Sequence, residues 1–234
     1  MQLFYNSDIK QGDSNFFFDK EESKHIVKVL RKKESDKIFI TNGLGFLFES
    51  EIILASEKKC EVKITKETFQ EPDAFYTHIA VAPTKMNDRL EWFLEKATEI
   101  GIHEITPIIC DHSERKVYKI DRAEKIIQAA MKQSLHYYIP KINEPISLSQ
   151  FVKSNIDGQK FIAHCEETDK KSFKNEVNKS EKATILIGPE GDFSTKEINL
   201  AIENNFIPVT LGNTRLRTET AALVACHTIA LINE

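Results

Sequence analysis

Hydrophobic residues recur with a period of two in the first third of the chain. The segment "DKIFITNGLGFLFESEIILA", residues 36–55, has two apolar runs on either side of Asn42-Gly43, and Asn-Gly is a strong hairpin signal. "KKCEVKIT" adds another alternating run. The one helical pattern covers residues 23–33, where Ile26, Val29 and Leu30 fall on one face. This pattern predicts a small β-barrel domain in residues 1–70.

The pattern changes after "TFQEPDAF", a segment around Pro72 with neither period. Five short apolar runs follow, and helical patterns separate them: "HIAVAP", "EITPIIC", "KFIAHC", "ATILIG" and "IPVTLG". Strands that alternate with helices are typical of a parallel α/β sheet. We therefore predict a second domain, of α/β class, in residues 73–234.

The helical stretches of this second domain differ in character. Leu90, Phe93, Leu94 and Ala97 form one apolar stripe, and Gly101 follows where a left-handed cap belongs. A second helix is expected from about residue 121 to 138, before Pro140. The lysine-rich residues 167–182 predict a solvated connection or a short surface helix.

The last segment, "ETAALVACHTIALINE", has almost no polar face. A helix that is apolar nearly all round must be covered on every side, and at the end of a chain a partner subunit is a plausible cover. The pattern thus favours a homodimer.

Composition indicates the cellular compartment and the kinds of ligand to expect. The chain has 234 residues, a formal net charge of −4 and four cysteines without a CxxC pair. Scattered cysteines suit a reducing compartment, and the lack of a leader or a long apolar run indicates a cytoplasmic protein without a membrane segment. The seven histidines include no HExxH, so we expect no metal. A net acidic chain that binds nucleic acid must do so through local basic patches.

"TILIGPEGDFSTKE" joins a strand to a helix through a glycine loop that carries Glu190 and Asp192. Ser194 and Glu197 have the spacing of a capping box, which starts the helix near Thr195. Loops at the carboxyl ends of parallel strands bind ligands in open α/β sheets, although the glycines alone could simply make a tight turn. Neither a P-loop nor GxGxxG is present, and carboxylates suit hydroxyl donors or a cationic ligand.

A second motif, "LGNTRLRTETAALVA", begins at Leu211. Arg215 and Arg217 lie in a loop after a strand, Glu219 is beside them, and Thr218 is placed to cap the final helix. A single surface arginine is usually only solvated. Two of them in a loop at a strand end indicate a site.

Together, "IGPEGDFS" and "LGNTRLRTETA" resemble the ribosomal RNA small subunit methyltransferase E family, in the SPOUT class of S-adenosyl-L-methionine-dependent enzymes. The resemblance covers the whole chain, because "HIVKVLR" is similar to the family's PUA-like barrel and "KMNDRLEWFLEKATEIGIHEITPI" to its methyltransferase domain. It implies a SPOUT-type parallel sheet with a deep trefoil knot at the carboxyl end, a fold that ordinary connection rules exclude, and a homodimer.

The resemblance also implies the chemistry. The substrate would be one uridine of 16S ribosomal RNA in the small (30S) subunit, methylated at N3 by a 16S rRNA (uracil-N3)-methyltransferase. The base must be unpaired and its N3 proton removed or compensated. We assign Arg217 to stabilise the uracil anion, while either Glu219 or Glu190 accepts a proton or binds the cofactor. The residues expected to hold S-adenosyl-L-methionine are His164, Cys165, Ile187, Gly188, Pro189, Glu190, Gly191, Leu211, Gly212, Leu216, Arg217 and Thr218.

RNA contacts are expected from local basic clusters. The candidates are Lys24, Lys28, Arg31, Lys32 and Lys33 in the first domain and Arg115, Lys116 and Arg122 in the second. Each cluster alone is more often a solvated face. For Cys165, beside His164, a small buried hydrophobe is favoured over a reactive thiolate.

The chain departs from the family pattern in two places. The family often has GPEGG where this chain has Asp192, and its second helix often carries an acidic residue, Gln and Arg where this chain has Lys132 and His136. These changes affect the expected substrate contacts. The competing hypothesis is a non-catalytic RNA-binding or ribosome-assembly module with the same fold.

Overall fold

The computed structural model describes residues 1–167 and 169–234, which form two compact units. The first unit contains Met1–Pro72 together with Met131–Ile139, and the second contains Asp73–Ala130 and Pro140–Glu234. The chain therefore returns once to the first unit after entering the second.

The first unit is built on a five-stranded sheet of order β1-β3-β4-β5-β2, in which only β1 and β3 are parallel. The predicted hairpin is confirmed, but residues 42–45 make a four-residue connection in which Asn42 Oδ1 accepts the backbone N–H of Leu44 at 2.9 Å. Phe4, Ile40 and Phe48 are in its buried core. The strands are β1 (Leu3–Tyr5), β2 (Asn15–Phe17), β3 (Lys37–Thr41), β4 (Phe46–Leu54) and β5 (Glu61–Phe69).

The helical segment of this unit differs from the prediction. It consists of α1 (Lys20–Lys24) followed by a π-helical turn, η1 (His25–Val29). Leu30 N–H donates to His25 O, five residues back, at 2.9 Å. This wider winding keeps Ile26 buried and Leu30 against the core but rotates Val29 outward to 65% exposure. Placing Val29 on the buried face was therefore wrong.

The second predicted helix of the later chain is also shorter than expected. α3 (Asp121–Ser134) ends where Leu135 adopts a left-handed backbone, with φ of 61°. The next residues run extended along the β3–β4 connection: Gly45 N–H donates to Tyr137 O and Ile139 N–H donates to Gly43 O, both at 3.0 Å. Residues 137–139 therefore pair with this connection and are not helical, while His136 N–H still donates to Met131 O at the end of α3.

The second unit has a parallel sheet of order β11-β13-β10-β12-β6-β7-β8, with the short β9 beside β7. All five predicted strands are present as β6, β7, β10, β12 and β13, and their ladders are parallel. Because these strands are buried on both faces of the sheet, their sequences are nearly continuous apolar runs. The strands are β6 (Tyr76–Val81), β7 (Glu104–Ile109), β8 (Lys141–Ile142), β9 (Ile146–Ser147), β10 (Gln159–Ala163), β11 (Lys171–Ser172), β12 (Lys182–Ile187) and β13 (Ile207–Thr210).

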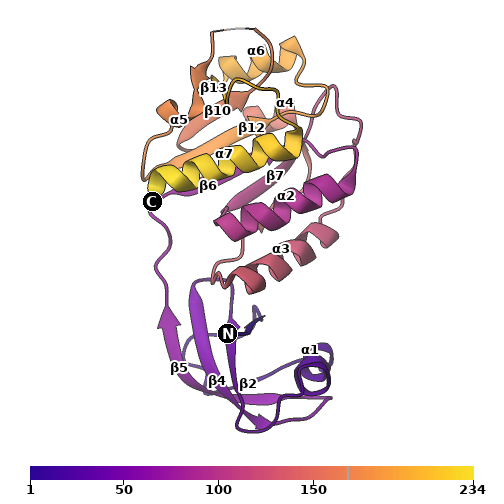
Figure 1. Ribbon diagram of the computed structural model, residues 1–234, viewed down its shortest axis with the longest axis vertical. Helices are drawn as coiled ribbons and strands as arrows, with labels where there is room; N and C mark the ends of the chain where they lie inside the picture. The colour runs from indigo at the N-terminus through magenta and orange to yellow at the C-terminus, as the bar shows by residue number, and fades with distance from the viewer. Residues whose placement is uncertain (168) are drawn as a thin grey trace. The chain divides into compact units, whose positions relative to one another are not determined.

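Helices cover both faces of this sheet. In Figure 1, α7 lies over β6 and β12 with α2 beside it, and the contacts of α7 with α2, β6 and β12 agree. Residues of α4 and α6 pack with Ala80 and Leu186 in a separate core cluster. Gly101 caps α2 in a left-handed conformation and Ser194 caps α6 in a full capping box, as predicted. The helices are α2 (Asn87–Ile100), α4 (Leu148–Val152), α5 (Phe173–Glu176), α6 (Thr195–Glu203) and α7 (Thr218–Asn233).

The lysine-rich connection contains the short helix α5, whose Phe173 is buried. It is thus anchored to the core by one aromatic side chain. Thr168, which belongs to the same predicted connection, lies outside the described residues.

A prediction follows for the β3–β4 connection. A Cβ on Gly45, where φ is +93°, would overlap the Tyr138 hydroxyl and lie 2.8 Å from Gln70 O. We expect Gly45→Ala to lower the free energy of unfolding by about 2–4 kcal/mol, from backbone strain and overpacking together. Gly12→Ala is the matched control, because Gly12 has φ of +86° and no atom within 4 Å, so only strain of about 1 kcal/mol applies. Urea denaturation measures both, and equal losses would contradict the packing role of Gly45.

Candidate functional site

The loops that follow β10, β12 and β13 meet around a cavity of about 340 Å³. We call it the GPEG cavity, after the loop of residues 188–191. It lies at the carboxyl ends of parallel strands, where open α/β sheets bind ligands. It brings together Cys165, most of the expected GPEG loop, and Arg217. Cys165 is exposed, so the expectation that it is a small buried hydrophobe was wrong. Its lining residues are Ala163, Cys165, Ile187, Gly188, Pro189, Glu190, Asp192, Arg215, Leu216, Arg217, Thr218 and Ala221.

A smaller cavity of about 90 Å³ shares Cys165, Arg215 and Leu216 with the GPEG cavity. His164, Leu211 and Gly212 line this smaller cavity. Of the residues expected to hold a cofactor, only Gly191 lines neither. A Cβ on Gly191 would lie 3.1 Å from the Cβ of His112, so its glycine allows the loop after β7 to approach closely.

The two loop carboxylates bind protein backbone. Glu190 Oε1 accepts the N–H of Lys85, in the loop after β6, at 3.0 Å, and Asp192 Oδ2 accepts the N–H of Cys165, after β10, at 2.7 Å. Asp192 has φ of 63°, a left-handed conformation that Asp tolerates better than most residues. The sequence suggested hydroxyl donors or a cationic ligand for these groups, whereas the structure gives them amide partners.

The start of α7 closes the cavity. The N-cap residue is Arg217, which makes no capping bond, and Thr218 Oγ1 instead donates to Gly188 O at 3.0 Å. The prediction that Thr218 caps this helix was therefore wrong, because the buried hydroxyl is used to tie α7 to the GPEG loop. Arg215 Nη2 donates to Glu190 O at 3.4 Å. In the described part of the chain, the guanidinium of Arg217 has no hydrogen-bond or ion-pair partner.

Two buried polar side chains near these loops have unused atoms. Both ring nitrogens of His164, a residue only 7% exposed, have no hydrogen-bond partner among the described residues, and neither does Glu219 Oε2. Burial, followed by the charge of Lys170, lowers the pKa of His164, so the ring is neutral near pH 7. Buried polar atoms without partners are costly and are typical of sites that a ligand or partner completes.

The basic residues proposed to contact RNA have different surroundings. Lys24, Lys28 and Arg31 are exposed in the first unit, and Lys116 is exposed in the second. Arg115 Nη2 donates to Lys85 O at 2.9 Å, while Arg122 Nε pairs with Glu91 at 2.6 Å. Arg115 therefore supports the loop after β6, and Arg122 has a carboxylate partner.

Comparison with known proteins agrees with this arrangement. Residues 71–230 match the model of an RNA methyltransferase domain, and residues 18–65 match that of an RNA methyltransferase PUA domain. A ribosomal RNA small subunit methyltransferase E from Buchnera aphidicola is 32% identical over 91% of this chain and 86% of that protein. The chain belongs to the ribosomal RNA small subunit methyltransferase E family. The PUA domain match identifies the first unit as PUA-like.

Other members and solved structures cover almost the full chain. The family protein of Bacillus subtilis is 28% identical over 92% of this chain and 89% of its own length. A crystal structure described as a "probable rRNA-methyltransferase" from Porphyromonas gingivalis superposes with a TM-score of 0.91 at 38% identity, covering 100% of this chain and 98% of that one. A methyltransferase structure from Legionella pneumophila, in complex with the cofactor SAM, has a TM-score of 0.88 at 28% identity, covering 99% and 97%.

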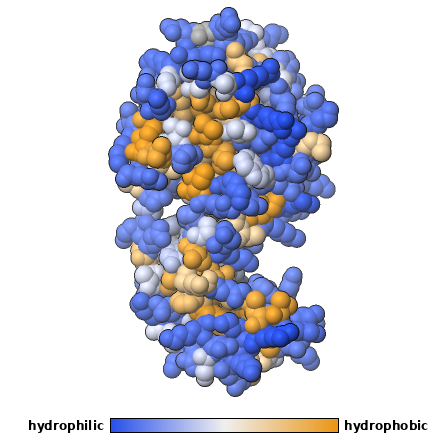
Figure 2. Space-filling view, viewed as in Figure 1, coloured by the Kyte–Doolittle hydropathy of each residue, from blue (hydrophilic) through white to orange (hydrophobic). Residues whose placement is uncertain are grey.

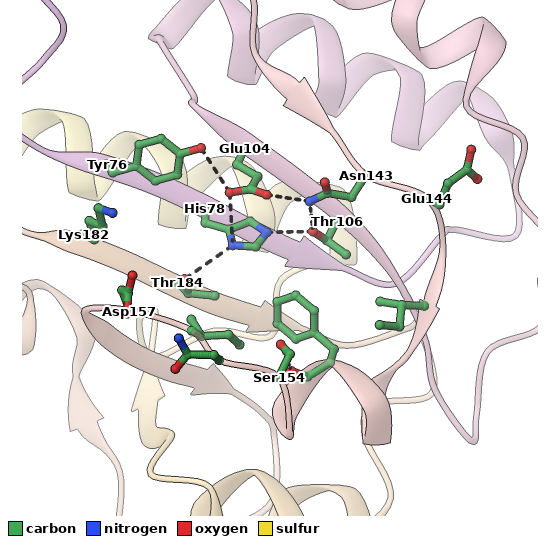
Figure 3. A pocket seen from close by; sticks show the side chains of 14 residues that line it. Tyr76, His78, Glu104, Thr106, Asn143, Glu144, Ser154, Asp157, Lys182 and Thr184 are labelled. Atoms are coloured by element: carbon green, nitrogen blue, oxygen red, sulfur yellow. Dashed lines mark hydrogen bonds and ion pairs between the residues drawn. The ribbon is translucent and has the colours of Figure 1, made fainter.

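This family member has a second, larger cavity of about 490 Å³ that sequence reasoning missed. We call it the His78 cavity (Figure 3). Its floor consists of side chains from the amino-terminal halves of three neighbouring strands, β12, β6 and β7, and its walls include Phe151 and Ile156. The signal was present in the sequence, since polar residues alternate at the start of each strand: Tyr76 and His78, Glu104 and Thr106, Lys182 and Thr184.

A continuous hydrogen-bond network fills this floor. Asn143 Nδ2 donates to Glu104 Oε1 and to Thr106 Oγ1, both at 2.7 Å. Thr106 Oγ1 also lies 2.7 Å from His78 Nε2, and the other ring nitrogen, Nδ1, is 3.5 Å from Thr184 Oγ1. Tyr76 donates to Glu104 Oε2 at 3.1 Å.

Burial controls the charge of this network. Desolvation lowers the pKa of His78 to about 4, despite the opposing charge of Glu104 3.9 Å away, so the ring is neutral near pH 7. Burial alone raises the pKa of Glu104, but the hydrogen bonds from Asn143 and Lys141 and the charge of Lys141 oppose it, and the net pKa is lowered. The pair is thus a neutral imidazole beside an ionised carboxylate.

No group of three His, Cys, Asp or Glu side chains suited to a metal ion occurs among residues 1–167 and 169–234. Over the same residues, no helix has the length and apolar character needed to span a bilayer.

The buried His78 predicts a pH-dependent stability. Its pKa is about 4 in the folded protein and 6.5 when unperturbed, so between these values the unfolded chain binds a proton that the folded one excludes. Stability then rises with pH across this window and is fully present above about pH 6.5. We expect wild type to lose about 3 kcal/mol more than His78→Gln in free energy of unfolding between pH 7 and pH 4. Urea denaturation at several pH values measures this loss.

The control for this prediction is His227→Gln, since His227 is exposed on α7. It should keep the wild-type pH dependence. A His78→Gln profile parallel to wild type would show that His78 is not held neutral by burial.

Proposed function

We propose that this protein transfers a methyl group from S-adenosyl-L-methionine to N3 of one specific uridine in 16S ribosomal RNA. The observation that carries the proposal is the GPEG cavity, in which three strand-end loops converge beside the unpartnered guanidinium of Arg217. Family membership supports an rRNA substrate, and the cofactor in the Legionella pneumophila structure supports the methyl donor. The identity of the methylated base, uridine, and of the methylated atom, N3, is inferred from the resemblance of the two motifs to the family.

The residues around the cavity fit such a cofactor. Cavities of this size hold small ligands when apolar walls are combined with a few polar groups. Ile187, Pro189 and Leu216 provide apolar surface, and the backbone of residues 188–191 and 211–218 can read an adenine edge. When bound, S-adenosyl-L-methionine supplies an electrophilic methyl group on a sulfonium. The neutral, unpartnered ring of His164 offers one donor and one acceptor to the same ligand.

Side chains of the protein then accept the N3 proton and stabilise the uracil anion. Removal of the N3 proton leaves an anion, which a cation beside the base stabilises. Arg217 is the residue for this task, because it lines the cavity and no described residue neutralises it. Glu219, two residues later with a buried and unpartnered Oε2, is our choice for the proton acceptor.

The two domains divide the work in this proposal. Residues 1–70 bind RNA through Lys24, Lys28 and Arg31, and residues 73–234 carry out methyl transfer, with Arg115, Lys116 and Arg122 as additional RNA contacts. An exposed basic side chain contributes through its attraction to phosphate. The substrate is found in the cytoplasm on this account, as part of the 30S subunit.

We further propose that the carboxyl end forms a trefoil knot. After β12 the chain passes through α6 to β13, on the far side of β10, and α7 then returns to pack on β6 and β12. This return path is the support for the knot, together with the resemblance to the SPOUT class.

A homodimer is the third structural proposal. Figure 2 shows apolar side chains gathered over α7, and Leu231 on this helix is 56% exposed. A second copy would cover this surface. Multi-angle light scattering of the purified chain tests this, and a monomer mass at micromolar concentration would contradict it.

The proposed activity is tested by transfer of labelled methyl from S-adenosyl-L-methionine to 30S subunits lacking the modification, with nucleoside analysis of the product. The expected product is 3-methyluridine in 16S ribosomal RNA. If the cofactor binds but no nucleoside is modified on subunits or naked RNA, the protein is instead a non-catalytic RNA-binding or ribosome-assembly module.

Arg217 gives a sharper prediction. We expect Arg217→Ala to lower kcat by about 100-fold, the loss typical when one group that stabilises a developing anion is removed. Its Kd for S-adenosyl-L-methionine should change little. Arg215→Ala is the matched control, since Arg215 lines the same cavity but its guanidinium is bound to Glu190 O, and its kcat should fall by less than tenfold. Equal losses in both variants would remove the special role of Arg217.

A further inference from the structure

We propose that Glu190 and Asp192 are positioning residues, which fasten the loops after both neighbouring strands to the GPEG loop and so build the walls of the GPEG cavity. This inference rests on the proposed function, because it assigns a task within the same site. It also separates Glu190 from the proton-acceptor role that the sequence left open between Glu190 and Glu219.

The order of the strands makes this arrangement possible. β12 is paired with β10 on one side and with β6 on the other. The loop that follows β12 is therefore the central one of three, and its carboxylates reach the first loop on each side. Glu190 binds the loop after β6 through Lys85 N–H, and Asp192 binds the loop after β10 through Cys165 N–H.

Side chains satisfy much of the backbone of the loop after β6. Its Lys85 amide donates to Glu190, while the carbonyl oxygens of Thr84 and Lys85 accept from Arg115 at 3.3 and 2.9 Å. The buried Thr84 hydroxyl donates to Met86 O at 2.6 Å. The loop has no regular secondary structure, so these side chains take the place of a ladder in satisfying its backbone.

Asp192 occupies a backbone position that favours glycine, and its side chain compensates for the strain. Its backbone is left-handed, with φ of 63°, which glycine adopts freely and an aspartate adopts at a cost of about 1 kcal/mol. In return, Oδ2 accepts Cys165 N–H at 2.7 Å and Oδ1 accepts Phe193 N–H at 2.9 Å. Hydrogen bonds to an ionised acceptor are the stronger kind, so two of them offset the strain.

Both carboxylates also line the GPEG cavity, as does Cys165. A ligand in this cavity would meet walls that are already ordered, and the entropy of fixing these loops would not be lost on binding. The acceptor geometry, and not a transferable proton, is therefore the property that these residues supply.

Amide replacements separate positioning from acid–base chemistry. Glu190→Gln keeps an acceptor oxygen for Lys85 N–H but has no useful basicity, whereas Glu190→Ala loses both. Asp192→Asn keeps one acceptor and tolerates the left-handed backbone, while Asp192→Gly keeps the backbone alone. Glu167→Gln is the charge-matched control, since Glu167 is exposed.

Three readouts are measured on the full chain: Kd for S-adenosyl-L-methionine by calorimetry, kcat at saturating cofactor, and amide hydrogen exchange at Lys85 and Cys165 by NMR. We expect about a tenfold rise in Kd for Glu190→Ala and Asp192→Gly, with kcat within about threefold of wild type. Exchange at the released amide should rise in the same variants. Glu190→Gln should restore Kd to near wild type, and Asp192→Asn should fall between.

Each contrary outcome is distinct. If Glu190→Gln abolishes turnover as Glu190→Ala does, Glu190 is a base and the positioning role is overturned. Unchanged Kd and unchanged amide exchange in Asp192→Gly would overturn the role of Asp192. If wild type binds no S-adenosyl-L-methionine, the proposed function fails and the cofactor part of this inference with it, whereas the exchange at Lys85 and Cys165 still shows whether the carboxylates hold the loops.

Discussion

The site depends on how backbone N–H groups at the carboxyl ends of parallel strands find acceptors once their ladders stop. Lys85 and Cys165 lie just beyond β6 and β10, and the carboxylates of Glu190 and Asp192 accept their amides. Thr218, at the start of α7, instead satisfies a backbone carbonyl, because its hydroxyl donates to Gly188 O. A single loop thereby gathers three others, and a cavity can exist among segments that have no sheet or helix of their own.

The same sheet carries a second cavity with a different character. The His78 cavity is larger, but its floor is an internally satisfied network, in which Asn143 and Thr106 engage Glu104 and His78. The GPEG cavity is smaller, and two buried side chains near its loops have atoms without a hydrogen-bond partner among the described residues: the ring of His164 and one oxygen of Glu219. Unmet hydrogen-bonding capacity, and not volume, is therefore our reason for proposing the ligand site at these loops.

The sequence was sufficient where local pattern determines structure. The five core strands, the Gly101 cap and the Ser194 capping box were predictable because buried parallel strands are apolar runs and caps need particular residues. The prediction failed where a residue distant in the sequence determines the local structure. Residues 137–139 pair with the β3–β4 connection instead of extending α3, and Thr218 bonds Gly188 instead of capping its own helix.

The His78 cavity was missed for a related reason. Its polar residues alternate within three separate strands, and only the register between β12, β6 and β7 brings them to one place. The π-helical turn that exposes Val29 likewise depends on packing in the core and not on the spacing of apolar residues. The motifs placed the candidate site at the loops that line the GPEG cavity, but the partners of Glu190 and Asp192 required coordinates.

The measurement that tests this account most directly is a titration of the isotope-labelled protein with S-adenosyl-L-methionine, followed by amide NMR shifts. We expect saturable changes at Cys165, Gly188, Gly191 and Leu216, around the GPEG cavity, while His78 and Thr184 remain unchanged. Shifts confined to the His78 cavity, or none at either place, would contradict the assignment of the cofactor site to the three loops.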